Sequence, residues 1–271
     1  MQNLKVLFLK CLDFDLEDSN NYGHPFYDNY QKVLLLDSET VEYKYLFFNC
    51  LFGIIEYLET FKKSSPQTFE HWKNRLKNNT KNVGLYSDIF EIYILWSLNG
   101  KGISFVKRER PDFEISYNDN KIFIECGSAQ FEPLSNPTQK SIFTKLKKVI
   151  KTNYTSGYLT SSSALFIDIT NLIFHSNQIN CIINTELLLK ALMTVSRELT
   201  YDKPEKIGIP GAITFMNFEY FMNDSGQNFG CNIVANFINP IFVDSNLSTF
   251  LENEFIPKIE QKDIYNPKFN H

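Results

Sequence analysis

The stretch RERPDFEISYNDNKIFIECGSA, residues 108–129, decides the fold predicted for this chain. Two runs of alternating apolar and polar residues, 112–117 and 121–127, flank the turn-forming triplet Asn-Asp-Asn, and this pattern predicts a β-hairpin. Successive side chains of a strand point to opposite faces, so the alternation fixes which residues share a face. The pattern therefore predicts that Asp112 and Glu125, one on each strand, converge at one end of the sheet.

Convergent carboxylates repel each other, and each raises the pKa of the other unless a cation lies between them. Hard oxygen ligands of this kind suit Mg²⁺ or Mn²⁺. A metal held there can polarise a scissile phosphate and lower the pKa of an attacking water. Simpler interpretations stay open, because Asp112 could only begin a strand after the proline turn and Glu125 could be a strand-end acid in solvent.

The elements around the hairpin predict an α/β fold. A helix over 87–98 and a strand over 102–108 precede it. Downstream the patterns predict a helix at 138–154, a strand at 163–170, a helix at 185–199, apolar runs at 211–218 and 231–237, and a short helix near 246–255. This order favours a mixed central β-sheet flanked by helices.

The first 80 residues read differently from the rest. Residues 41–63 and 65–79 have helical periodicity and are joined at a Ser-Pro helix-start signal. The sequence therefore predicts a mainly helical region, 1–80, packed on an α/β core, 81–271.

The composition limits the functional classes. With 271 residues, 43% of them hydrophobic, the chain can bury a sizeable core. The net charge of -4 provides no global cationic field, so a nucleic-acid partner would need a local basic patch. The five cysteines are widely spaced without a CxxC pair, which indicates neither a disulfide framework nor a zinc site. No apolar run approaches the ~18 residues of a membrane helix, and we expect a cytoplasmic protein without membrane association.

A helical Glu, then Pro-Asp, then a strand ending in Glu-x-Lys resembles the signature of the PD-(D/E)xK nuclease superfamily. The matching residues are Glu91 in SDIFEIYILW, Asp112 in RPDFEI and Glu125 in IFIECG, and the resemblance covers roughly residues 87–170. It implies a restriction-endonuclease-like core. It also implies that Asp112 and Glu125 ligate Mg²⁺ or Mn²⁺, and that Glu91 binds the metal directly or through water.

The chain departs from the superfamily pattern at Gly127, where the motif usually has Lys. Members of the superfamily sometimes supply this lysine from the following helix, where Lys148 and Lys151 share a helical face. These two lysines are therefore candidate catalytic residues, although such lysines more often form a solvated helix face. Gln130 is a polar alternative near the strand end.

Three neighbouring features have more than one interpretation. Asp88 and Glu91 form a D-x-x-E pattern, so Glu91 could belong to a capping box. Asp168 ends a predicted strand and is expected to be a structural cap rather than a fourth ligand. A phosphate-contacting patch, or simple neutralisation of nearby acids, would explain three basic residues beside the motif: Lys107, Arg108 and Arg110.

The function expected from the resemblance is a divalent-metal-dependent nuclease that acts on DNA in preference to RNA. A role in restriction or anti-phage defence is implied by the superfamily alone. Because Gly127 replaces the motif lysine, the alternative is a catalytically silent PD-(D/E)xK fold that serves as a nucleic-acid-binding or assembly module. A structural protein without a nucleic-acid partner is a third reading, and a homodimer or a partner protein stays open.

Overall fold

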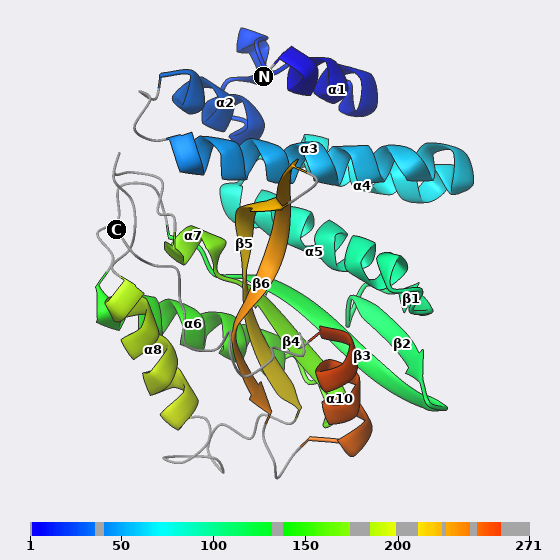
Figure 1. The fold of residues 1–271 in the computed structure, drawn as a ribbon, viewed down its shortest axis with the longest axis vertical. Coiled ribbons are helices and arrows are strands. Elements are labelled where there is room, and N and C mark those ends of the chain that lie inside the picture. The colour runs from blue at the N-terminus through cyan, green and yellow to red at the C-terminus, as the bar shows by residue number, and fades with distance from the viewer. Residues whose placement is uncertain are drawn as a thin grey trace.

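The computed structural model describes residues 2–35, 41–131, 138–173, 185–198, 211–223, 226–238 and 243–255 (Figure 1). Its centre is a six-stranded sheet in the order β1-β2-β3-β4-β5-β6. The pairs β3–β4 and β4–β5 are parallel and the other neighbours are antiparallel. The predicted mixed sheet flanked by helices, with a helical N-terminal region, is therefore confirmed.

The strands follow one another across the sheet in chain order. They are β1 (Phe105–Lys107), β2 (Phe113–Tyr117), β3 (Asn120–Ser128), β4 (Ser163–Asp168), β5 (Ala212–Asn223) and β6 (Gly226–Ile238). The predicted hairpin is β2–β3, in which Phe113 pairs with Ile124. Its turn residues Asn118 and Asp119 have φ angles of 47° and 62°, a left-handed conformation that Asn and Asp tolerate better than most residues.

Helices connect the strands and cover both faces of the sheet. They are α5 (Asn82–Gly100) before β1, α6 (Gln139–Tyr154) between β3 and β4, α7 (Thr170–Ile173) and α8 (Thr185–Arg197) between β4 and β5, and α10 (Ser245–Phe250), which continues as a π-helical turn over Leu251–Phe255. The predicted helix at 87–98 is longer than expected, because α5 begins at Asn82. Across the described residues, no helix combines the length and apolarity needed to span a membrane.

The N-terminal region contains α1 (Gln2–Leu12), η1 (Ser19–Asn21), α2 (Pro25–Leu35), α3 (Val41–Ser64) and α4 (Pro66–Asn78). The helices α3 and α4 match the two predicted ones, and Pro66 stands in the first turn of α4 as the start signal requires. The sequence analysis did not predict α1 or α2. Apolar side chains of α1, α3 and α4 join the same buried cluster as α5 and the sheet. Figure 1 shows α1, α3 and α5 stacked in layers.

Two hydrophobic clusters lie on opposite faces of the sheet. The larger one joins the N-terminal helices, α5 and α10 to side chains such as Phe113 and Ile124. The smaller one joins α6 and α8 to side chains such as Leu165 and Phe215. Every residue of β4 is buried, because both faces of this central strand are covered. The hairpin β2–β3 lies toward one edge of the sheet, where polar side chains can enter the interior.

Candidate functional site

The two hairpin acids meet at one end of β2–β3. Asp112 directly precedes β2 and Glu125 lies on β3, one position beyond the pair Phe113 and Ile124. The Asp112 amide donates to Glu125 Oε2 at 3.2 Å, and the Cys126 amide donates to Asp112 Oδ2 at 2.7 Å. Each carboxylate thus binds the backbone of the opposite strand, which fixes both side chains in one place.

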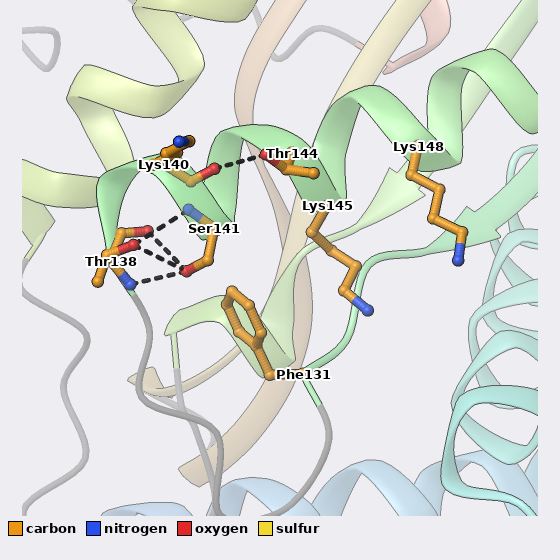
Figure 2. Close-up of a pocket in the computed structure, with 7 residues that line it drawn as sticks. All are labelled: Phe131, Thr138, Lys140, Ser141, Thr144, Lys145 and Lys148. Atoms are coloured by element: carbon orange, nitrogen blue, oxygen red, sulfur yellow. Dashed lines mark hydrogen bonds between the residues drawn. The ribbon is translucent and has the colours of Figure 1, made fainter.

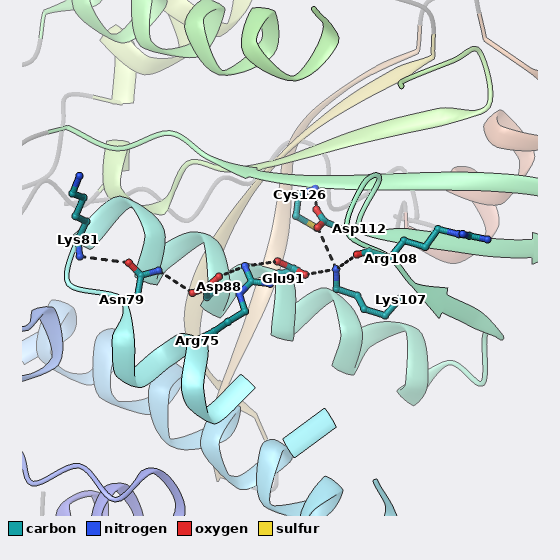
Figure 3. Close-up of polar contacts among 9 residues, drawn as sticks. All are labelled: Arg75, Asn79, Lys81, Asp88, Glu91, Lys107, Arg108, Asp112 and Cys126. Atoms are coloured by element: carbon teal, nitrogen blue, oxygen red, sulfur yellow. Dashed lines mark hydrogen bonds and ion pairs between the residues drawn. The ribbon is translucent and has the colours of Figure 1, made fainter. Parts of the chain in front are cut away.

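Helix α5 adds Glu91, and strand β1 adds a cation. Glu91 is 4% exposed. The Lys107 Nζ lies 2.6 Å from Glu91 Oε1 and 3.3 Å from Asp112 Oδ1, so its ammonium bridges the two acids (Figure 3). Of the three basic residues beside the motif, Lys107 therefore pairs with two nearby acids, while Arg108 pairs with Glu114 instead. The guanidinium of Arg110 lies over the Tyr158 ring.

A second cation reaches the cluster from the N-terminal region. Arg75 of α4 pairs with Asp88 and, at 3.2 Å, with Glu91 Oε2 (Figure 3). The Asn79 side-chain amide also donates to Asp88, at 2.9 Å. The capping-box interpretation of Asp88 and Glu91 is wrong, because α5 begins six residues before Asp88. Both acids lie in the middle of the helix and contact this polar network.

Tyr158 completes the surroundings of Glu125. Its hydroxyl donates to Glu125 Oε1 at 2.6 Å from the segment between α6 and β4. Burial, followed by this hydrogen bond, raises the pKa of Tyr158 to about 12, so the hydroxyl keeps its proton. We call the three acids Glu91, Asp112 and Glu125 the carboxylate cluster.

Burial, and repulsion between the carboxylates, disfavour the ionised forms of the carboxylate cluster. Burial, and then the charge of Glu125, raise the pKa of Asp112 to about 6. Burial and then the charge of Asp112 raise the pKa of Glu91, and burial also raises the pKa of Glu125. Burial opposes the protonated form of Lys107, but Glu91 and Asp112 outweigh it and raise the pKa of that ammonium. A further cation would therefore stabilise the ionised cluster.

The donor chemistry of the cluster fits Mg²⁺ or Mn²⁺, because three carboxylates supply hard oxygen ligands. Within the described ranges, however, no group of three or more His, Cys, Asp and Glu side chains is arranged as a ligand shell. The Lys107 ammonium lies between Glu91 and Asp112. A metal bound to both of these acids would require Lys107 to withdraw from at least one of them.

The other predicted candidates lie elsewhere. Lys148 and Lys151 are exposed on α6, and in the described part of the chain neither forms an ion pair with the carboxylate cluster. A Cβ atom on Gly127 would lie 3.3 Å from Val149 Cγ1, so position 127 faces α6 with little free space. Gln130 is buried and donates to Ser128 Oγ at 2.9 Å. The lysine that contacts the acids is therefore Lys107 rather than Lys148 or Lys151.

Asp168 acts as the cap that its position predicts. Its Oδ1 accepts from the Thr170 amide at 2.8 Å and from the Thr170 hydroxyl at 2.5 Å, at the start of α7. Ser128 also contacts the carboxylate, at 3.5 Å. These partners of Asp168 are uncharged, and Asp168 is not part of the carboxylate cluster.

Sequence reasoning missed Arg75 and Tyr158, which are distant from the motif in the chain. Lys107 had a usable signal, since it ends the strand that pairs with the start of β2, where Lys107 stands opposite Phe113. A basic residue at that register is placed beside Asp112.

Comparison of the chain with protein-family models, with curated proteins and with solved structures found no match. The function is therefore inferred from the geometry and chemistry of the carboxylate cluster.

Proposed function

We propose that this chain is a divalent-metal-dependent nuclease that hydrolyses phosphodiester bonds, in DNA in preference to RNA. The observation that carries the proposal is the meeting of three buried acids, Glu91, Asp112 and Glu125, from α5 and both strands of the hairpin. The element order α5-β1-β2-β3-α6-β4 supports it, because helix, hairpin, helix and strand belong to the resemblance to the PD-(D/E)xK superfamily. A cytoplasmic role in restriction or anti-phage defence goes with this proposal.

Each residue of the site has a defined task. Glu91, Asp112 and Glu125 would hold Mg²⁺ or Mn²⁺, which when bound polarises the scissile phosphate and lowers the pKa of a water. Lys107 takes the place of the lysine missing at Gly127. Held beside two carboxylates it stays an ammonium, so it stabilises negative charge on phosphate oxygens rather than accepting a proton. Tyr158 orients Glu125 through its hydrogen bond.

One observation favours a second candidate function. The Lys107 ammonium already bridges Glu91 and Asp112, which is the arrangement expected if a lysine replaces the metal permanently. The chain would then be a catalytically silent fold, acting as a nucleic-acid-binding or assembly module with a second copy or a partner protein.

A cleavage assay tests the nuclease proposal. Purified protein with millimolar Mg²⁺ or Mn²⁺ is expected to cut at least one of plasmid, single-stranded DNA and RNA. The change Asp112→Asn should lower the rate by at least about 100-fold, because even outer-shell partners of metal ligands contribute about 10- to 100-fold. Asp168→Asn is the matched control, since it alters a buried aspartate outside the cluster and should leave the rate nearly unchanged.

Calorimetric titration with Mn²⁺ separates the two candidates. In a nuclease, Lys107→Met should keep or tighten Mn²⁺ binding while it lowers cleavage, because the competing ammonium is gone. Inertness of the wild type on all three substrates, together with no bound Mn²⁺, would remove the nuclease and leave the silent fold.

A further inference from the structure

A groove lies along the N-terminal half of α6, beside Phe131. Its volume is about 540 Å³, and it is open to solvent. Among the described residues, its lining contains three lysines, three hydroxyl side chains and one aromatic ring, namely Lys140, Lys145, Lys148, Thr138, Ser141, Thr144 and Phe131. Figure 2 shows Lys145 and Lys148 extending from α6 toward the side on which the Phe131 ring lies. We call this the α6 groove.

Among the described residues, no acid pairs with the lysines of the α6 groove. Helix α6 contains five lysines and no Asp or Glu. Lys147, on another side of the helix, pairs with Glu198 at 2.6 Å. In the part of the chain that the structure describes, none of Lys140, Lys145 and Lys148 forms an ion pair. In the described part of a chain with net charge -4, three cations without ion pairs thus gather in one groove.

The remaining polar groups of the groove are already satisfied. Thr138 and Ser141 bind each other in a capping box, and the Thr144 hydroxyl donates to the Lys140 carbonyl at 2.8 Å (Figure 2). The lysine ammonium groups are therefore the donors left for a ligand, which favours an anion over a neutral polar molecule. Phe131 adds an apolar ring, and the Lys145 Nζ lies 5.9 Å from its centre.

We propose that the α6 groove binds a single nucleic-acid strand, with its lysines at the phosphates and Phe131 stacked on a base. Cations beside an aromatic ring are the combination by which proteins hold single strands. A volume of about 540 Å³ suits a nucleotide. In a duplex the bases are stacked on one another, so their faces would not be open to Phe131. This inference rests on the proposed function and deepens it, because it names the single-stranded form of the substrate.

Helix α6 also packs against the strand that carries Glu125. Val149, next to Lys148, has its Cγ1 3.3 Å from the Cβ position of Gly127. Gly127 is two residues from Glu125 on β3.

Fluorescence anisotropy in EDTA tests the groove apart from cleavage. The probe is a labelled DNA strand of about 20 nucleotides, longer than the ~4–16 nucleotides that one such site covers. Changing the three groove lysines to glutamine, as K140Q, K145Q and K148Q together, should weaken binding at least about tenfold and flatten the slope of log affinity against log salt by about 2. The matched control carries K62Q, K63Q and K81Q on exposed lysines of α3 and the start of α5, and should bind nearly as the wild type does.

The ring is tested by Phe131→Leu, which keeps an apolar side chain against the α6–α8 core. Because stacking contributes ~1–3 kcal/mol per base, it should weaken single-strand binding about fivefold or more and leave binding of the matching duplex unchanged. Melting temperatures of all variants verify that they fold.

Four results would overturn the inference: unchanged affinity of the groove variant, equal loss in both triple variants, tighter binding of duplex than of single strand, or binding only to phosphatidylserine vesicles. If the groove fails while the wild type still cleaves, the proposed nuclease stands. If the strand binds in the groove but is never cleaved, the groove stands and the nuclease falls.

Discussion

Two buried aspartates, Asp112 and Asp168, differ in the groups that surround them. The pKa of each is raised to about 6, with burial as the largest cause. At Asp112 the charge of Glu125 adds to the rise and Lys107 opposes it, whereas at Asp168 only hydrogen bonds, mainly from Thr170, oppose it. A raised pKa alone therefore marks burial, and charged groups that act on one another mark a candidate site.

The largest change in stability is expected from the titration of Asp168, the aspartate outside the carboxylate cluster. The folded-state pKa of Asp168 is about 6 against an ordinary value of 3.8, so its contribution to stability is complete below 3.8 and is lost as pH rises through 6. A shift of about 2 units corresponds to about 3 kcal/mol. Asp168→Asn cannot ionise and still accepts from Thr170. Urea unfolding from about pH 4 to about pH 7 should show the wild type losing this amount relative to the variant, and parallel profiles would contradict it.

A smaller loss of stability is expected near the carboxylate cluster, from Arg75→Met. The methionine keeps an apolar stem over Trp72 but leaves Asp88 and Glu91 without their shared guanidinium. Breaking a buried pair costs about 3–5 kcal/mol, and because the Arg75 side chain is 37% exposed we expect about 2 kcal/mol by urea unfolding.

Adding Asp88→Asn to Arg75→Met should recover part of that loss, because one unpaired charge is removed. Lys10→Met breaks the exposed pair with Glu59 and should have almost no effect. If Lys10→Met cost as much as Arg75→Met, the network around Glu91 would be no different from a surface pair.

The smallest effect is expected from Tyr158→Phe, which removes only the hydrogen bond to Glu125. Because Tyr158 is half-buried, we expect about 1 kcal/mol of stability to be lost. The pKa of Glu125 should rise, since this bond lowers it. Carboxylate titration by NMR should show this rise while Asp168 keeps its own pKa, and a parallel rise at Asp168 would contradict the separation of the two aspartates.

The hairpin and the flanking helices could be predicted because their signals are local. Alternation over 112–117 and 121–127 and the Asn-Asp-Asn turn are short-range patterns, and α6 follows from its helical period. Two features escaped prediction. The helices α1 and α2 were not expected, and the start of α5 at Asn82 was placed too late, because Asn82–Ser87 contains no strong start signal.

The residues of the site likewise divide into those predictable from local patterns and those that depend on tertiary packing. Asp112 and Glu125 could be brought together from strand alternation, since the turn fixes their register. Arg75 could not, because its contact with Glu91 depends on how α4 packs against α5. Lys148 and Lys151 were chosen by helical spacing, which says which residues share a face but not what that face meets.

The cation between Glu91 and Asp112 is supplied by a short edge strand of the sheet. Strand β1 has three residues and pairs with β2 alone, and Val106 at its centre is 56% exposed. Outer strands of this length open locally at far lower free energy than central ones such as β4. The electrostatic balance of the interior therefore depends on how stably this edge strand is paired, and amide exchange of residues 105–107 is the measurement that reports it.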